Sequence, residues 1–190
     1  MKCLVLLAGC GLGDGSCIEE AILTYAALDK YGCDYTPAAE DACVPSVNHL
    51  TEQAAESRNI LLEAARIGRG RIKDIRRIDL EEYNALIIPG GIGLLNNYKN
   101  SSAAKACITH FISRKKPIAA MCAGIDFLQS FFGSDLLASE AKEMTAEEFC
   151  FDADSNVYYT PAFRKTASCY TALLGINSMI HALNQSQTAY

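Results

Sequence analysis

The amino-acid sequence predicts an α/β fold, in which a mainly parallel sheet carries helices on both faces. Three observations support this class. The expected strands are short apolar runs without polar alternation, as in strands that are buried on both faces. These runs alternate along the chain with segments of helical pattern. Three of the runs end in turns of small residues, at Gly9, Pro89 and Cys122, and ligands bind at such strand ends in parallel sheets.

The first strand and the first helix flank a glycine-rich loop. Residues 4–8 are an apolar run that predicts a strand, and the glycines at positions 9, 11, 13 and 15 predict a loop. Ser16 and Glu19 fit a capping box, so a helix is expected from residue 16 to about residue 30. The cap gives Glu19 a structural role and leaves Glu20 without one. The apolar positions expected to pack on the sheet are Ile18, Ala21, Ile22, Tyr25 and Leu28.

The remaining elements follow from the same patterns. Further strands are expected at residues 33–36, 85–88 and 117–121. Further helices are expected at residues 58–69, which Gly70 ends, at 102–113, and after Gly124 to about residue 132. Residues 38–53 have loop composition. Residues 149–151 and 157–160 predict a hairpin, followed by a closing helix from residue 162 to about 183 and a frayed end of seven residues.

Length and composition indicate one globular domain that spans residues 1–190. Half of the residues are hydrophobic and 21% are charged, which excludes disorder for the bulk of the chain. The net charge of −5 gives no reason to expect nucleic acid or an anionic membrane as a partner. No apolar run reaches the ~18 residues that span a bilayer.

The nine cysteines are irregularly spaced and include no C-x-x-C pair, so reduced thiols in the cytoplasm are expected. Residues 1–10 have the outline of a lipoprotein signal that ends at Cys10. The apolar stretch from residue 3 to residue 8 is shorter than the ~7–15 residues of a signal peptide, so a retained N-terminus is expected.

Cys122 has the sequence setting of a nucleophile elbow, between an apolar strand and a helix, with small residues at Ala120, Ala123 and Gly124. The helix N-terminus would lower the pKa of the thiol. A buried cysteine that packs as a small hydrophobic residue fits the same letters. Backbone N–H groups of Gly90 and Gly91 would supply an oxyanion hole beside it, although a plain glycine turn is the simpler interpretation of that segment.

Other candidate sites are weaker. The first loop does not fit G-x-G-x-x-G, which disfavours nucleotide binding. No metal site is expected, because the three histidines form no cluster; His110 and His181 are interpreted as surface or packing residues, and His49 remains open. A solvated surface is the preferred interpretation of the basic run Arg66, Arg69, Arg71, Lys73, Arg76 and Arg77.

Motifs along most of the chain together resemble one family. They are Leu7-Ala8-Gly9-Cys10-Gly11 with Asp14-Gly15-Ser16, Glu20-Ala21, Asn48-His49-Leu50-Thr51, Glu56-Ser57-Arg58-Asn59, Glu63-Ala64-Ala65-Arg66-Ile67, Pro89-Gly90-Gly91 with Gly93 and Asn97, Lys116-Pro117-Ile118, Cys122 and Thr160-Pro161-Ala162-Phe163. In this order they resemble the ElbB-type branch of the PfpI superfamily, whose members are relatives of class I glutamine amidotransferases. The resemblance implies a flavodoxin-like, doubly wound sheet and a homodimer.

By this resemblance Cys122 is the nucleophile and Glu20 is the carboxylate beside it. Gly90, Gly91, Ala123, His49 and Asn97 are the candidates for oxyanion and substrate binding. The chain departs from relatives in having shortened insertions after Asn97 and before the final hairpin. It also has no histidine directly after Cys122 and no H-x-E, which argues against a peptidase or a glutaminase.

The function expected from these residues is a cofactor-independent, glyoxalase-type conversion of a small 2-oxoaldehyde, such as methylglyoxal, to a hydroxy acid. Cys122 would add to the aldehyde and Glu20 would move a proton between the adjacent carbons. This chemistry predicts a depressed pKa for Cys122 and a raised pKa for Glu20. A redox-sensing thiol or a small-ligand-binding domain is the alternative from another class.

Overall fold

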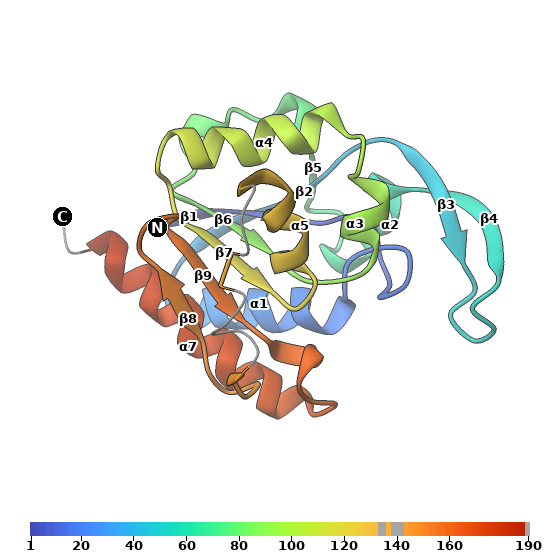
Figure 1. Cartoon of the computed structure of the whole chain (residues 1–190). Coiled ribbons are helices and arrows are strands. Elements are labelled where there is room, and N and C mark those ends of the chain that lie inside the picture. Colours follow the sequence, from blue (N-terminus) through green and yellow to red (C-terminus); the bar gives the residue numbers. More distant parts are fainter. Residues whose placement is uncertain (133–135, 138–142, 189–190) are drawn as a thin grey trace.

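A seven-stranded sheet forms the centre of the computed structural model, which describes residues 1–132, 136–137 and 143–188. Its strand order is β5-β2-β1-β6-β7-β9-β8 (Figure 1). All pairs are parallel except the pair of β8 with β9. The strands are β1 (Lys2–Leu6), β2 (Asp34–Ala39), β5 (Lys73–Asp74), β6 (Ala85–Ile88), β7 (Ile118–Met121), β8 (Cys150–Asp152) and β9 (Val157–Thr160). The order of β2-β1-β6-β7-β9 is that of flavodoxin-like sheets, which confirms the predicted fold class.

Helices cover both faces of the sheet, with α1 and α7 on one face and α4 and α5 on the other (Figure 1). The described α-helices are α1 (Ile18–Lys30), α2 (Ile60–Ile67), α3 (Gly93–Asn97), α4 (Ser102–Ser113), α5 (Gly124–Phe132) and α7 (Cys169–Thr188). Short 3-10 turns lie at Ile75–Arg77, Leu80–Glu82 and Ala162–Arg164. Within these residues no helix is both long enough and apolar enough to cross a membrane.

The central strands are buried along most of their length, as their apolar sequences predict. Every residue of β6, β7 and β9 is buried, and so are four of the five residues of β1. The hairpin of β8 and β9 is also confirmed. Because β1, β6 and β7 end at the same edge of the sheet, the turns that follow them come together there.

The start of the first helix differs from the prediction. Ser16 is not its N-cap, because the buried Ser16 hydroxyl accepts a hydrogen bond from the Ala8 N–H at 2.9 Å. Cys17 takes the N-cap position without a side-chain cap, and its thiol donates to Glu19. The buried face of α1 also differs from the predicted face, because this helix packs against α7 as well as against the sheet. Two residues predicted in the core, Ile18 and Ile22, are exposed.

The loop predicted at residues 38–53 is wrong in part, because this region contains strands. β2 continues to Ala39, and β3 (Cys43–Val47) pairs with β4 (Ala54–Asn59) in a separate antiparallel hairpin that projects from the body (Figure 1). Most of its residues are exposed or half-buried, so the hairpin lacks the apolar pattern by which strands are predicted. Helix α2 begins at Ile60, two residues later than predicted, because Asn59 caps it by accepting from the Leu62 N–H.

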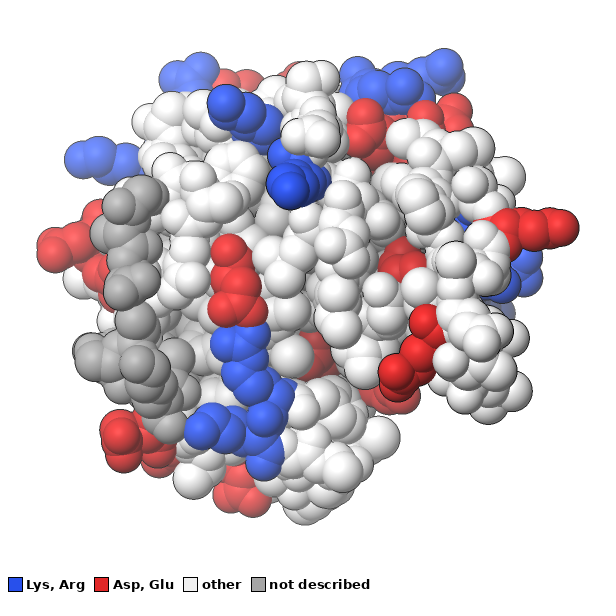
Figure 2. All heavy atoms as spheres, turned by 45° about the vertical axis from the view of Figure 1, so that its right-hand side comes forward, with Lys and Arg blue, Asp and Glu red and all other residues white. Residues whose placement is uncertain are grey.

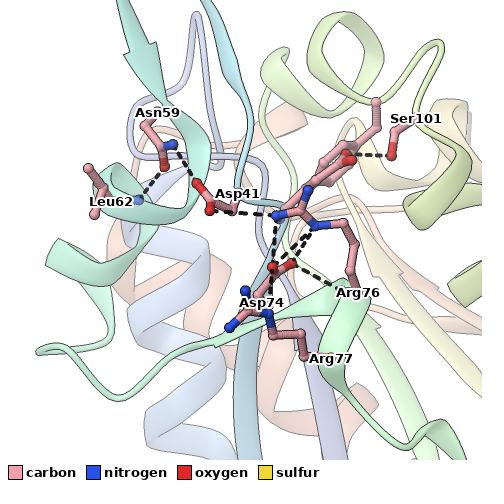
Figure 3. Close-up of polar contacts among 9 residues, drawn as sticks. Asp41, Asn59, Leu62, Asp74, Arg76, Arg77 and Ser101 are labelled. Atoms are coloured by element: carbon pink, nitrogen blue, oxygen red, sulfur yellow. Dashed lines mark hydrogen bonds and ion pairs between the residues drawn. The ribbon is translucent and has the colours of Figure 1, made fainter.

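Three residues of the basic run from Arg66 to Arg77 form ion pairs. Arg76 donates to both carboxylate oxygens of Asp74 and also pairs with Asp41, which accepts a hydrogen bond from Asn59 (Figure 3). Arg77 pairs with Asp74, and Arg66 pairs with Glu63. On the face shown in Figure 2, residues of both charges are scattered among uncharged ones, at the edges and near the centre. These contacts agree with the solvated surface that the sequence analysis prefers.

The C-terminal helix is shifted from its predicted bounds. A 3-10 turn at Ala162–Arg164 follows β9, and α7 begins only at Cys169. Pro161 and the positive φ of Ala162, 45°, interrupt an α-helix here. The helix continues to Thr188, so the frayed end predicted for the last seven residues is wrong as far as residue 188; residues 189–190 lie outside the described part.

Candidate active site

Cys122 lies in a sharp turn between β7 and α5. Its φ of 49° is in the left-handed region that side chains rarely adopt, as expected for a nucleophile elbow. The turn is held by the Cys122 N–H, which donates to Thr160 O at 3.2 Å. Gly124 allows close packing, since a Cβ there would lie 2.8 Å from Ile88 O. The thiol is half-buried, and the Ala123 N–H donates to its sulfur.

Glu20 lies next to this thiol, with a side chain that is fully buried although it carries a carboxyl group. Its Oε2 accepts the Gly90 N–H at 2.7 Å, and Oε1 accepts the Phe163 N–H at 3.4 Å. The Cys122 thiol lies close enough to this carboxyl group to lower its pKa. A Cβ on Gly90 would overlap the carboxyl group and lie 2.8 Å from the Cys122 Cβ, so only glycine permits this approach.

Burial has the largest effect on the pKa of both Glu20 and Cys122. Burial raises the pKa of Glu20 from 4.5 to about 7, although hydrogen bonds from Gly90, Phe163 and Cys122 lower it in part. Burial and the Glu20 charge raise the pKa of Cys122 to about 11, against the lowering effects of the Ala123 N–H and of Arg164. The raised pKa predicted for Glu20 is therefore confirmed. The depressed pKa predicted for Cys122 is wrong, because desolvation outweighs the helix N-terminus.

Arg164 is a residue of this site that the sequence analysis missed. It ends the 3-10 turn after β9, and its guanidinium lowers the pKa of the Cys122 thiol. It also forms an ion pair with Asp126, in the first turn of α5, in which Nη1 lies 3.5 Å from Oδ1 and Nη2 contacts Oδ2. The motif Thr160-Pro161-Ala162-Phe163 ends one residue before Arg164 and was the available signal.

The predicted oxyanion donors divide into two groups. The Gly90 N–H is committed to Glu20 and is therefore not directed at a substrate oxygen, contrary to prediction. The Gly91 N–H takes part in no hydrogen bond among the described residues. The Ala123 N–H faces the sulfur. The Gly90 N–H is thus excluded as an oxyanion donor, and the N–H groups of Gly91 and Ala123 remain candidates.

His49 and Asn97 contact the glycine-rich loop rather than Cys122 or Glu20. His49 Nε2 accepts the Gly13 N–H at 3.1 Å and lies 3.7 Å from Asp14 Oδ1. Asn97 Nδ2 donates to the carbonyl oxygens of Ala8 and Asp14, both at 2.8 Å. These contacts give both residues a structural role in fixing the loop, and do not support the substrate-binding role predicted for them.

Two further observations concern polar groups near the site. The Tyr159 hydroxyl is buried and has no hydrogen-bond partner among the described residues. Burial raises the pKa of Tyr159 to about 12, and Arg164, Cys122 and Asp126 all act on it electrostatically. The described residues contain no group of three or more His, Cys, Asp or Glu side chains that could hold a metal ion.

Comparisons with known proteins identify relatives of this chain. The human protein named glutamine amidotransferase-like class 1 domain-containing protein 3, mitochondrial, is 32% identical over 133 residues, which cover 62% of this chain and 49% of that protein. The zebrafish (Danio rerio) ES1 protein, mitochondrial, is 29% identical over 105 residues, covering 52% of this chain and 39% of that protein. The matched part thus spans about half or less of these relatives' length.

Solved structures extend the likeness over the whole chain. An isoprenoid biosynthesis protein with an amidotransferase-like domain from Ehrlichia chaffeensis superposes with a TM-score of 0.87 at 30% identity, covering 98% of this chain and 99% of that one. Oxidized DJ-1 from Toxoplasma gondii, at 16% identity and a TM-score of 0.52, shares the fold. Residues 12–139 match the model of the DJ-1/PfpI family. The chain therefore belongs to the DJ-1/PfpI family, a PfpI-superfamily protein with a class I glutamine amidotransferase-like fold.

Proposed function

We propose that this protein converts small 2-oxoaldehydes to 2-hydroxy acids without a cofactor, with Cys122 as nucleophile and Glu20 as the group that moves protons. The observation that carries the proposal is the contact between the Cys122 thiol and a buried carboxyl group whose pKa is about 7. A group with this pKa is present in both protonation states near neutral pH, so it can accept and return a proton in one cycle.

The first step joins the substrate to the protein. Because the pKa of the thiol is higher than that of Glu20, the sulfur carries the proton at rest and the ionised carboxylate removes it as the sulfur attacks the aldehyde carbon. The C–S bond forms, and Glu20 passes the proton to the aldehyde oxygen. The product of this step is a hemithioacetal, and Glu20 is again a carboxylate.

The second step moves hydrogen between the adjacent carbons. Glu20 takes the proton from the carbon bonded to sulfur and returns it to the former ketone carbon, and the proton of the hemithioacetal hydroxyl passes to the former ketone oxygen. The first carbon is thereby oxidised to a thioester and the second is reduced to a carbon that bears a hydroxyl group. The N–H groups of Gly91 and Ala123 stabilise the oxyanion that develops. Water then cleaves the thioester, which releases the hydroxy acid and restores the thiol. The overall change is the addition of one water molecule, with no external oxidant.

A redox-sensing role for Cys122 has less support. Sensor cysteines are thiolates of low pKa, whereas burial holds the pKa of Cys122 at about 11. The same burial suits a thiol that is deprotonated only when a substrate and a base are in place.

The test is conversion of methylglyoxal by the purified protein in buffer that contains EDTA and no glutathione, with the hydroxy acid measured as product. Cys122→Ser and Glu20→Gln should each abolish the conversion, because each removes one member of the thiol and carboxyl pair. Cys43→Ser and Glu19→Gln are matched controls, since both residues are exposed, and these variants should retain the wild-type rate. Retained conversion in folded Glu20→Gln would contradict the proposal.

A further inference from the structure

We propose that Arg164 is an anion-binding residue of this site, and that the preferred substrate is a 2-oxoaldehyde that also carries a carboxylate. The inference rests on the proposed function for its reaction, and on the placement of Arg164, Cys122 and Asp126 for its specificity.

The backbone places Arg164 beside the reacting sulfur. Thr160, at the end of β9, accepts the Cys122 N–H, so β9 and the elbow are joined at this point. The Arg164 N–H donates to Pro161 O at 3.0 Å, which closes the turn that follows. The Phe163 N–H then donates to Glu20, and the next residue, Arg164, pairs with Asp126 in the first turn of the helix that follows Cys122. These contacts hold Arg164 beside the elbow, where its charge acts on the Cys122 thiol.

The guanidinium retains capacity for a ligand. It carries five N–H donors on three nitrogens, and Asp126 accepts hydrogen bonds from the two terminal nitrogens. The Arg164 side chain is 36% exposed and that of Asp126 is 39% exposed, so solvent reaches this ion pair. Exposed ion pairs are weak, and a substrate carboxylate that presents the bidentate geometry arginine prefers can share or replace Asp126.

The charges around Arg164 also explain why this cation would favour a substrate carboxylate over other anions. Asp126 cancels its charge at rest, and Glu20 is negative in its ionised form. A diffuse attraction of all anions is therefore not expected. A carboxylate attached through the ketone carbon of a substrate bonded to Cys122 is held next to the guanidinium, and this proximity lets it compete with Asp126.

The first test measures binding without turnover. Iodoacetate and iodoacetamide alkylate the same thiol but differ in charge, so the ratio of their rates at Cys122 reports anion recognition and cancels any change in thiol pKa. We expect Arg164→Gln to lower the iodoacetate-to-iodoacetamide ratio at least tenfold and Asp126→Asn to raise it. The control Arg69→Gln removes an exposed cation in the loop after α2 and should leave the ratio unchanged. A ratio in folded Arg164→Gln that equals the ratio of the control would overturn the inference.

A second measurement uses the unchanged protein, so that it does not depend on the folding of a variant. 4-Oxopentanoate should protect Cys122 from iodoacetamide at concentrations at least tenfold lower than its uncharged amide does. Equal protection by the two compounds would count against anion recognition.

Measurements of turnover test this inference and the proposed function separately. Wild-type protein should show a higher kcat/KM for 4,5-dioxopentanoate than for methylglyoxal, and Arg164→Gln should lose this preference through KM. If neither compound is converted while the alkylation ratio still depends on Arg164, the proposed reaction is wrong and the anion site stands. If both are converted with equal kcat/KM, the reaction stands and the carboxylate preference is wrong.

Discussion

Replacing Glu20 with glutamine should make the protein more stable at alkaline pH while it removes activity. Glu20 is fully buried, and burial raises the pKa of its carboxyl group from 4.5 to about 7. Between these values the folded state binds more protons than the unfolded state, so stability falls as the pH rises. At 1.36 kcal/mol per pH unit, the difference costs the folded state about 3 kcal/mol once the carboxyl group is ionised. About 2 kcal/mol of this loss falls between about pH 5.5 and 8.5.

Glutamine removes the titration but not all of the hydrogen bonds. Its single carbonyl oxygen can accept only one of the N–H groups of Gly90 and Phe163, and the lost bond costs about 1 kcal/mol. Glu20→Gln should therefore match the wild type near pH 5.5 and be more stable by about 2 kcal/mol near pH 8.5.

Urea unfolding followed by circular dichroism, under reducing conditions at a series of pH values, measures this difference directly. Glu19→Gln is the matched control, because Glu19 is the exposed neighbour on the same helix and contributes the smallest of the named effects on the pKa of Glu20, so this variant should change the pH dependence far less than Glu20→Gln does. Parallel pH dependence for wild type and Glu20→Gln, within about 0.5 kcal/mol, would refute the raised pKa and the role that depends on it.

Two predictions concern stability away from the reacting groups. Tyr83→Phe removes a buried hydroxyl that has no partner among the described residues, and it should leave the free energy of unfolding unchanged or raise it by up to about 1 kcal/mol; a loss of stability in urea unfolding would show that the hydroxyl is paired. Asn97→Ala removes two hydrogen bonds to the carbonyl oxygens of Ala8 and Asp14 and should lower the free energy of unfolding by about 2 kcal/mol, whereas an unchanged urea midpoint would argue against a structural role.

The sequence predicts the sheet well because strands that are buried on both faces have apolar sequences, which can be identified locally. The residues of β6 and β7 are wholly apolar, and their predicted positions agree with the structure within one residue. The hairpin of β3 and β4 has no such apolar sequence, since most of its side chains do not enter the core.

The site is predicted in part for a related reason. The elbow at Cys122 depends on small neighbours that can be identified in the sequence, and Glu20 was identified through resemblance. The error over Ser16 arose because its hydroxyl meets Ala8 in the folded chain, a contact that a capping pattern cannot reveal. The pKa of Cys122 depends on burial, and the position of Arg164 depends on the turn after β9; both are properties of the tertiary structure.

Trapping the intermediate on Cys122 tests the central claim most directly. Wild-type protein is mixed with methylglyoxal, quenched during turnover, treated with hydroxylamine and analysed by mass spectrometry. A thioester on Cys122 should yield the hydroxamate of the 2-hydroxy acid, and Glu20→Gln, which lacks the carboxylate for both proton transfers, should yield none. Absence of the hydroxamate from the wild type, or an equal yield from Glu20→Gln, would contradict the assignment of Cys122 and Glu20 as the reacting pair.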